Sequence, residues 1–229
     1  MTNQLNQAKN LFQNQPGVIL RMRAKPGKGN ELFDLTTQLH YVEDPDGPVD
    51  WALCRTNDEP DTLWAFELYR DDASFTRHYA NPIIDKRHDH VFALLADMPL
   101  RADIHVVCSS NTEQEIASIT ENPSFHKGQP GVVLRMQAKP GKGSGLFALT
   151  TQLHHVEDPD GPTDWMLCRV NDEPDTLWAF EFYRNDASFT RHYANPIVDK
   201  RHDDVIALLA DMPLRADLHI ESSSTQPTE

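Results

Sequence analysis

The chain has 229 residues, of which 39% are hydrophobic and 24% charged, a composition typical of one or two globular domains rather than of a disordered chain. Its formal net charge of −14 disfavours binding to the phosphate backbone of nucleic acids. No apolar run approaches the ~20 residues that a membrane-spanning helix needs, and the polar residues 1–15 lack the apolar core of a secretory signal. We therefore expect neither nucleic acid nor a membrane as a partner.

Three cysteines, Cys54, Cys108 and Cys168, are scattered along the chain. Their odd number and their spacing fit neither a disulfide framework nor a CxxC metal site, and no set of His, Cys, Asp or Glu has recognisable metal-ligand spacing. Cys54 and Cys168 lie between large apolar residues and are predicted to be core residues. A reducing cytoplasm is the simplest compartment for such a chain.

An internal repeat organises the sequence. Residues 15–106 align with residues 129–220 without a gap, and 16 of the 92 aligned positions differ. Two long copies are too few for a solenoid, so we expect two similar domains that pack about a pseudo-twofold axis. Residues 113–119 could form a short helix between them. The expected boundaries are a first domain at 15–107, a polar linker at 108–128 and a second domain at 129–221.

The first half of each copy begins with a strand. Residues 18–24 alternate between two faces, which predicts a strand, and a Pro-Gly turn follows. Apolar residues at helical spacing then predict an amphipathic helix over 28–43. The proline- and glycine-rich residues 44–48 must form a loop. Two strands, 50–56 and 62–70, are joined by a polar turn and predict a hairpin.

The second half of each copy is helical and ends in a strand. Asp71 or Asp72 can cap a helix that runs to about Ala80. Pro82, two residues further on, interrupts this helix. A second helical piece is predicted over 83–96. The last predicted strand spans 99–107.

The order β-α-β-β-α-β is that of a ferredoxin-like unit, with both helices on one face of the sheet. The strands nevertheless carry bulky apolar side chains on both faces, with Trp64 and Phe66 on one and Leu63 and Tyr69 on the other. A second face this apolar should not remain in water. We therefore predict an α+β fold in which the two repeats pack sheet to sheet as an intramolecular, pseudo-dimeric eight-stranded barrel, with helices outside and a cavity in each half.

Several short runs resemble one family in their order and spacing. They are KPGKG at 25–29, Asp-Gly at 46–47, DEPD at 58–61, LWAFELY at 63–69, and DASFTRH at 72–78, which matches the pattern D-x-A-[LF]-x-x-H. With these runs, each copy resembles an antibiotic biosynthesis monooxygenase domain of the dimeric α+β barrel superfamily. Members are usually homodimers of one domain, so this chain looks like such a dimer fused into one polypeptide, and a higher oligomer of the whole chain stays open.

The resemblance implies a class of chemistry. Many members of the family oxidise phenols, anthrones or quinols with O₂ and without flavin, haem or metal. A base removes a proton, the electron-rich anion reduces O₂, and the protein supplies an apolar pocket and donors for the enolate. We therefore expect a cofactor-independent monooxygenase for a small aromatic, quinol or polyketide-like substrate. The alternatives are a non-catalytic barrel that binds a small ligand, an isomerase or a decarboxylase, because one fold hosts many chemistries.

His78 and His192 occupy the family's histidine position on the helix that follows the hairpin. An imidazole titrates near neutral pH, which suits a general base, although a helix histidine can also serve structural hydrogen bonding or face water. The resemblance implies these two residues as the catalytic bases. Their neighbours Tyr79 and Tyr193 are expected to point elsewhere.

His88 and His202 provide an alternative reading of the site. A haem-degrading branch of the same superfamily carries its haem-ligating histidine ten residues after the position of His78. That branch has a tryptophan where this chain has His78, and an asparagine on its first strand, which residues 18–24 lack. Haem therefore remains an alternative cofactor. The other interpretation is that residues 87–90 form a solvated face of a helix.

Aromatic and acidic residues of the central strands are further candidates. The tryptophans could line a pocket for a flat aromatic substrate or could form core, and the strand tyrosines could donate a hydrogen bond to a substrate oxygen. The strand glutamates match a family glutamate. A buried carboxylate would need a partner, and Glu67 could pair with Arg70 or Arg21 or could orient His78. The predicted substrate-binding residues are Trp51, Trp165, Trp64, Trp178, Tyr69, Tyr183, Glu67 and Glu181.

The two copies keep the same candidate residues, so neither half is predicted to be inactive. The alignment pairs Ala52 with Met166, and if this position touches the ligand, added methylenes at ~0.8 kcal/mol each predict two sites of unequal affinity. The remaining histidines are expected at the surface or at strand ends. They are His40, His154, His105 and His219.

Overall fold

The computed structural model describes residues 14–41, 44–110, 126–156 and 158–224. Its strands are β1 (Pro16–Arg23), β2 (Asp50–Thr56), β3 (Thr62–Leu68), β4 (Leu100–Ser109), β5 (Pro130–Gln137), β6 (Asp164–Val170), β7 (Thr176–Phe182) and β8 (Leu214–Ser223). Its helices are α1 (Gly29–His40), α2 (Asp72–Tyr79), α3 (Pro82–Leu94), α5 (Gly143–His154), α6 (Asp186–Tyr193) and α7 (Pro196–Leu208). The predicted order of elements is confirmed in both repeats. The helix predicted at 113–119 lies outside the described residues.

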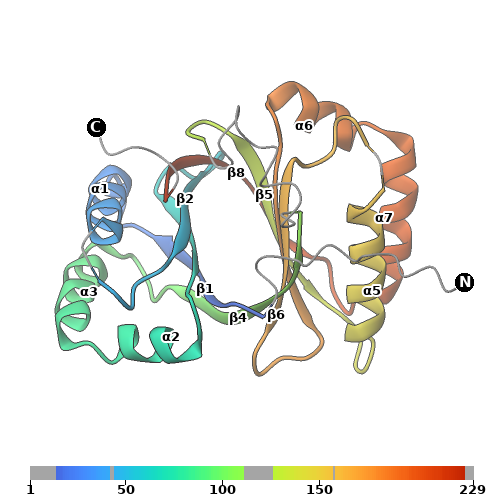
Figure 1. Cartoon of the computed structure of the whole chain (residues 1–229). Helices are drawn as coiled ribbons and strands as arrows, with labels where there is room; N and C mark the ends of the chain where they lie inside the picture. Colours follow the sequence, from blue (N-terminus) through green and yellow to red (C-terminus); the bar gives the residue numbers. More distant parts are fainter. Residues whose placement is uncertain (1–13, 42–43, 111–125, 157, 225–229) are drawn as a thin grey trace, which may run out of the picture.

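The eight strands close into one barrel, in the order β1-β3-β2-β8-β5-β7-β6-β4. Within a repeat, β3 pairs antiparallel with both β1 and β2, and β1 also pairs with β4. The predicted α+β pseudo-dimeric barrel is therefore confirmed. Figure 1 shows α1, α2 and α3 on one side of the barrel and α5, α6 and α7 on the opposite side.

The last strand of each repeat joins the two halves. The first part of β4 pairs with β1 of its own repeat, whereas Ile104–Ser109 pairs with β6 of the other repeat. In the same way β8 pairs with β5 and then with β2. Both long strands shift register by a bulge near the middle of this cross-pairing. Each repeat therefore depends on the other to complete its hydrogen bonding.

Aromatic side chains fill the interior of the barrel. The rings of Trp64 and Trp178 meet edge to face with centroids 5.8 Å apart, and those of Phe66 and Phe180 lie 4.7 Å apart. These side chains come from both halves and are buried. The apolar inner face of each sheet, which the sequence predicts cannot remain in water, is therefore covered by the inner face of the other sheet. The same core contains Ala52, Met166, Cys54 and Cys168.

The outer face of each half-barrel packs against its own helices. In the first repeat Leu32 of α1 and Val91 of α3 belong to one core with Trp51 and Leu63 of the strands, and the second repeat has the equivalent core. The molecule thus has three layers, with a helical layer on each side of the barrel (Figure 1). None of the helices in the described part of the chain is long and apolar enough to cross a membrane.

Candidate functional site

Each repeat holds one large cavity between its helices and the outer face of its half-barrel. The empty space in the first amounts to about 910 Å³ and in the second to about 800 Å³, and both volumes include space that is open to solvent. The walls are mainly aliphatic and aromatic, with a few polar side chains among them, which is the usual make-up of a small-molecule site. The polar side chains on the first cavity are Thr36, His40, Glu67, His78, Tyr79, Arg87, His88 and Arg101.

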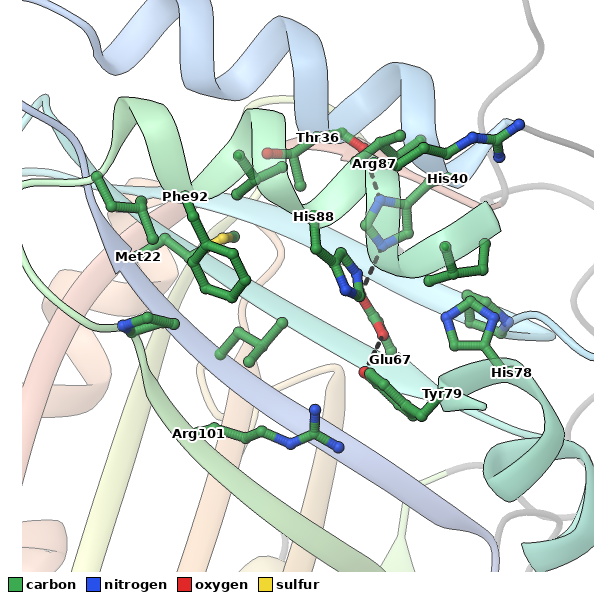
Figure 2. Close-up of a pocket in the computed structure, with 17 residues that line it drawn as sticks. Met22, Thr36, His40, Glu67, His78, Tyr79, Arg87, His88, Phe92 and Arg101 are labelled. Carbon is green, nitrogen blue, oxygen red and sulfur yellow. Dashed lines mark hydrogen bonds and ion pairs between the residues drawn. The ribbon is translucent and has the colours of Figure 1, made fainter. Parts of the chain in front are cut away.

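A buried carboxylate lies at the centre of the first cavity's polar wall. Glu67 projects outward from β3, and its Oε1 accepts a hydrogen bond of 2.9 Å from Nε2 of His40. Its Oε2 accepts a 2.7 Å bond from the hydroxyl of Tyr69, and the Tyr79 hydroxyl lies 3.4 Å from the same oxygen. Figure 2 shows His40 and Tyr79 approaching Glu67 from opposite sides. The second repeat reproduces the arrangement with Glu181, His154, Tyr183 and Tyr193.

The hydrogen bonds fix the charge of His40. Its Nδ1 donates to the carbonyl oxygen of Thr36 at 2.8 Å, and its Nε2 faces Glu67, so both ring nitrogens face acceptors and both need a proton. Burial alone disfavours the charged ring, yet the hydrogen bond and charge of Glu67 outweigh it and raise the pKa of His40. Burial likewise disfavours the carboxylate, but His40 and then Tyr69 lower the pKa of Glu67 to about 2. The pair is therefore an imidazolium and a carboxylate.

A second histidine faces the same cavity from α2. Nδ1 of His78 lies 2.8 Å from Oδ2 of Asp44, and His192 has the same contact with Asp158 at 2.9 Å. When Asp44 is ionised, Nδ1 carries the proton that it shares with the carboxylate, and Nε2 is left as the basic nitrogen. Among the described residues Nε2 of His78 has no hydrogen-bond partner. Figure 2 shows the ring of His78 at the end of the cavity nearest to α2.

Local sequence holds this histidine in place. The side chain of Asp71 caps α2 by accepting from the backbone of Ser74, and Ser74 completes the capping box. Arg77 reaches from the same helix to Asp46 with two hydrogen bonds, of 3.0 and 2.7 Å, and so ties α2 to the loop that carries Asp44. The cap and this ion pair therefore position His78 against Asp44.

An aromatic row forms one wall of the first cavity. The ring of His88 lies 6.3 Å from that of Tyr79 and 6.4 Å from that of Phe92. The guanidinium of Arg101 covers the other side of Tyr79, 4.0 Å from its ring centre. Figure 2 shows that the side chain of His88 extends from α3 into the cavity. The expectation that residues 87–90 form only a solvated face is thus wrong for His88, which lines the first cavity, as His202 lines the second.

Several sequence candidates meet at the cavities. Glu67, His78 and His88 line the first, and Glu181, His192 and His202 line the second. Tyr69 and Tyr183 contact the buried glutamates from below the cavity surface. Glu67 pairs with His40 instead of the suggested Arg70 or Arg21, and Asp44 instead of Glu67 contacts His78.

The tryptophans lie elsewhere. Trp64 and Trp178 point into the barrel interior and line neither cavity, and their indole N–H groups have no hydrogen-bond partner in the described part of the chain. Trp51 and Trp165 support the site from behind, with ring centroids 4.6 and 4.7 Å from those of His40 and His154.

Position 52 also lies away from both cavities. Ala52 and Met166 belong to the barrel core and line neither cavity. The expectation that this pair makes the affinities of the two sites unequal by contacting the ligand is therefore wrong. An alternating strand offers an inward and an outward face, and the sequence pattern alone does not say which face the cavity is on.

Sequence reasoning missed His40 and Tyr79 and their equivalents His154 and Tyr193. His40 was expected at the surface, but its side chain is only 6% exposed. A signal was present, because His40 continues the buried line of Leu32 and Thr36 at intervals of four residues along α1. Tyr79 was expected to point away from His78, yet both line the cavity because α2 ends there. His105 and His219 lie on strands with part-exposed side chains, as expected.

The fold and the two cavities define a dimeric α+β barrel formed by one chain. Residues 17–89 match the family model described as antibiotic biosynthesis monooxygenase. This match covers most of the first repeat, and the second repeat is a gap-free copy of the first.

Solved structures with the same fold span almost the whole chain. A Fusobacterium nucleatum protein, provisionally assigned as a monooxygenase, aligns over 93% of this chain and 95% of its own, with a TM-score of 0.72 and 14% identity. A protein from Lactobacillus acidophilus with the same provisional assignment aligns over 93% and 97%, with a TM-score of 0.68 and 12% identity. An anthrone oxidase-like protein aligns over 94% of both chains, with a TM-score of 0.70 and 10% identity. At these identities the likeness concerns the fold. No curated protein matches the chain.

Proposed function

We propose that the chain is a cofactor-independent monooxygenase that oxidises a small aromatic, quinol or polyketide-like substrate with O₂ in each of its two cavities. One observation carries the proposal: an Asp-oriented histidine, His78 on Asp44, faces a mainly apolar cavity with Nε2 available to accept a proton. The same arrangement recurs at His192. The anthrone oxidase-like neighbour and the domain family favour the same class of substrate.

His78 is a better candidate for the base than His40. Nε2 of His40 already carries a proton, which it donates in a hydrogen bond to Glu67. Removal of this proton would leave a buried carboxylate without its charged partner. Nε2 of His78 has no such partner in the described residues, and Asp44 stabilises the imidazolium that forms when it accepts a proton. The geometry therefore supports proton transfer by His78 and a fixed electrostatic role for the pair of His40 and Glu67.

The reaction balances without an external reductant. His78 removes the phenolic or benzylic proton, and the resulting anion gives electrons to O₂ and forms a carbon–oxygen bond. Loss of water from the hydroperoxide leaves a carbonyl, so that a CH₂ group and O₂ become C=O and H₂O. The proton that His78 accepted returns to the departing oxygen. A phenol with a free para position follows the same balance to a quinone and water.

Oxygen uptake with a panel of anthrones and quinols tests the proposal. We expect His78→Ala and His192→Ala each to retain part of the uptake and the double variant to lose at least a hundredfold, because a positioned base contributes about 10²–10⁴-fold. Asp44→Asn, which keeps the shape but not the charge, is expected to lower kcat and to shift its pH profile. Full activity of the double variant would rule out these histidines as the bases. Ligand binding without any oxygen uptake would favour the non-catalytic barrel.

Haem is the second candidate, because His88 and His202 line the cavities instead of facing solvent. Against it, His78 stands where the haem-degrading branch has tryptophan, and β1 carries no asparagine. The test is titration with haemin. A Soret band that His88→Ala and His202→Ala each weaken and the double variant abolishes would support haem, and the absence of a band would eliminate it.

A further inference from the structure

The walls of the two cavities differ in sequence at two positions. All residues that line either cavity are identical in the two repeats except Ile84, which corresponds to Val198, and Phe92, which corresponds to Ile206. The first difference is a single methylene at a buried site, which changes the affinity by roughly fourfold at most. The second replaces an aromatic ring by an aliphatic chain, so any difference in ligand preference should lie mainly there.

Phe92 adds a ring to the first cavity that the second cavity lacks. It follows Tyr79 and His88 along the wall, and Figure 2 shows its ring facing the cavity near Met22. In the second repeat the row contains Tyr193 and His202, whose rings lie 6.1 Å apart. Ile206 is not among the residues that line the second cavity.

The exposure of Phe92 indicates that a ligand can use it. The side chain is 46% exposed although it borders a cavity, so part of one apolar face has no protein partner. A planar ligand that extends past His88 can stack on this face, whereas a ligand that ends at His88 cannot reach it. Ile206 offers no flat surface for stacking at the equivalent place.

We propose that Phe92 and Ile206 are the residues that give the two cavities different specificities, the first cavity favouring multi-ring planar aromatic ligands and the second lacking this preference. The proposal rests on the proposed function for the aromatic nature of the ligand, and does not depend on the chemical step. A stacked aromatic pair predicts that the first cavity binds a three-ring ligand about three- to tenfold more tightly than the second.

Calorimetric titration without turnover tests the difference. The three-ring probe is anthraquinone-2-sulfonate, which has no CH₂ group or phenol to oxidise, and the single-ring probe is hydroquinone under anaerobic conditions. For the three-ring probe we expect two classes of site in the unaltered protein. Phe92→Ile should leave two weak sites, Ile206→Phe should give two tight sites, and the double exchange should restore one tight and one weak site. Hydroquinone should bind all four proteins with affinities within about twofold.

The exchange variants carry their own structural control. Each introduces a side chain that the same position already carries in the other repeat, and thermal unfolding checks that the barrel is retained. If Phe92→Ile keeps the tight site, or Ile206→Phe gains none, the inference is wrong while the proposed function stands. If the exchange pattern holds but no anthrone or quinol supports oxygen uptake, the specificity assignment stands and the monooxygenase proposal fails. If neither probe binds, both fail.

Discussion

At the scale of single residues, the pair of His40 and Glu67 is the most consequential feature of the first cavity. The two charged side chains are 6% and 9% exposed, so each has lost most of its hydration. Such a pair is worth little as a net source of stability, but removal of one partner leaves an uncompensated buried charge. The cavity wall therefore has a fixed dipole whose orientation is set by the Thr36 carbonyl and the Tyr69 hydroxyl.

Substitution of Glu67 should reveal this dependence. We expect Glu67→Gln to lower the free energy of unfolding by about 3 kcal/mol at pH 5.5, because His40 loses its counter-ion. Glu181→Gln should have a similar effect, since its contacts are the same. The matched control is Glu31→Gln on α1, whose ion pair with Lys28 is solvent-exposed and should contribute under 1 kcal/mol. Chemical denaturation measures all three, and equal effects at Glu67 and Glu31 would contradict the buried pair.

The same pair predicts how stability depends on pH. The pKa of Glu67 is lowered from 4.5 to about 2, so its contribution is complete above pH 4.5 and is lost as the pH falls towards 2. The pKa of His40 is raised above 6.5, so its contribution is complete below pH 6.5 and is lost at higher pH. We expect the free energy of unfolding to fall between pH 4.5 and pH 2 in the unaltered protein. In the double variant Glu67→Gln, Glu181→Gln the slope should be clearly smaller in denaturant titrations.

The residues that form the site were harder to predict from the sequence than the positions of the strands. His78 and Glu67 stood out because they belong to runs with a recognisable spacing, and Trp64 did so because it is large. Alternation places Trp64 and Glu67, three residues apart on one strand, on opposite faces, but it does not say which of the two faces carries the cavity. His40 and Asp44 reach the site from other elements, and only tertiary packing brings them to Glu67 and His78.

At the scale of elements, β1 and β3 approach each other too closely for a side chain at Gly17. A Cβ atom there would lie 2.5 Å from the carbonyl oxygen of Glu67 and 2.9 Å from Cδ2 of Leu68. The glycine therefore allows the strand that carries Glu67 to lie against β1 in its observed register. Gly131 has the same role beside β7.

Two glycine-to-alanine substitutions should have opposite signs. Gly17→Ala should lower the free energy of unfolding by about 1–3 kcal/mol, because overpacking must displace β3. Gly145→Ala should raise it by about 0.5–1 kcal/mol, because Gly145 lies inside α5 with no atom within 4 Å of the added methyl group. Thermal or chemical unfolding measures both. A neutral Gly17→Ala would show that β1 and β3 can separate at little cost.

At the scale of the whole molecule, barrel closure depends on the cross-pairing of β4 with β6 and of β8 with β2. In a single repeat one edge of β2 and the outer part of β4 would lack a partner strand, and the apolar interior face would be uncovered. Unpaired strand edges and a large apolar face both favour association. The covalent link makes this association intramolecular.

A polypeptide of residues 1–110 should therefore form a dimer or larger species in analytical ultracentrifugation. In such a dimer β2 of one copy can pair with β4 of the other, as β2 pairs with β8 in the whole chain. The intact chain provides the comparison, because its unfolding midpoint should not change with protein concentration. A well-behaved monomer of residues 1–110 would show that one repeat can satisfy its edges alone.

Much of this architecture followed from periodicity. The repeat, the β-α-β-β-α-β order and the doubly apolar strands were enough to predict the α+β barrel, because few arrangements bury both faces of such a sheet. The exchange of β4 and β8 between halves was not predicted. Strand pairing between residues 57 to 66 positions apart depends on tertiary contacts, for which Ile104–Ser109 carries no local signal.

Fusion of the two half-barrels gives each cavity a separate coding sequence. In a homodimer, any substitution appears in both subunits, and asymmetric pairs can be obtained only as part of a mixture with both symmetric pairs. Here a change at Phe92 leaves Ile206 untouched, and every molecule carries the same combination. Every copy of the chain therefore combines two different half-barrels, so that one cavity can gain a new ligand while the other retains the old one.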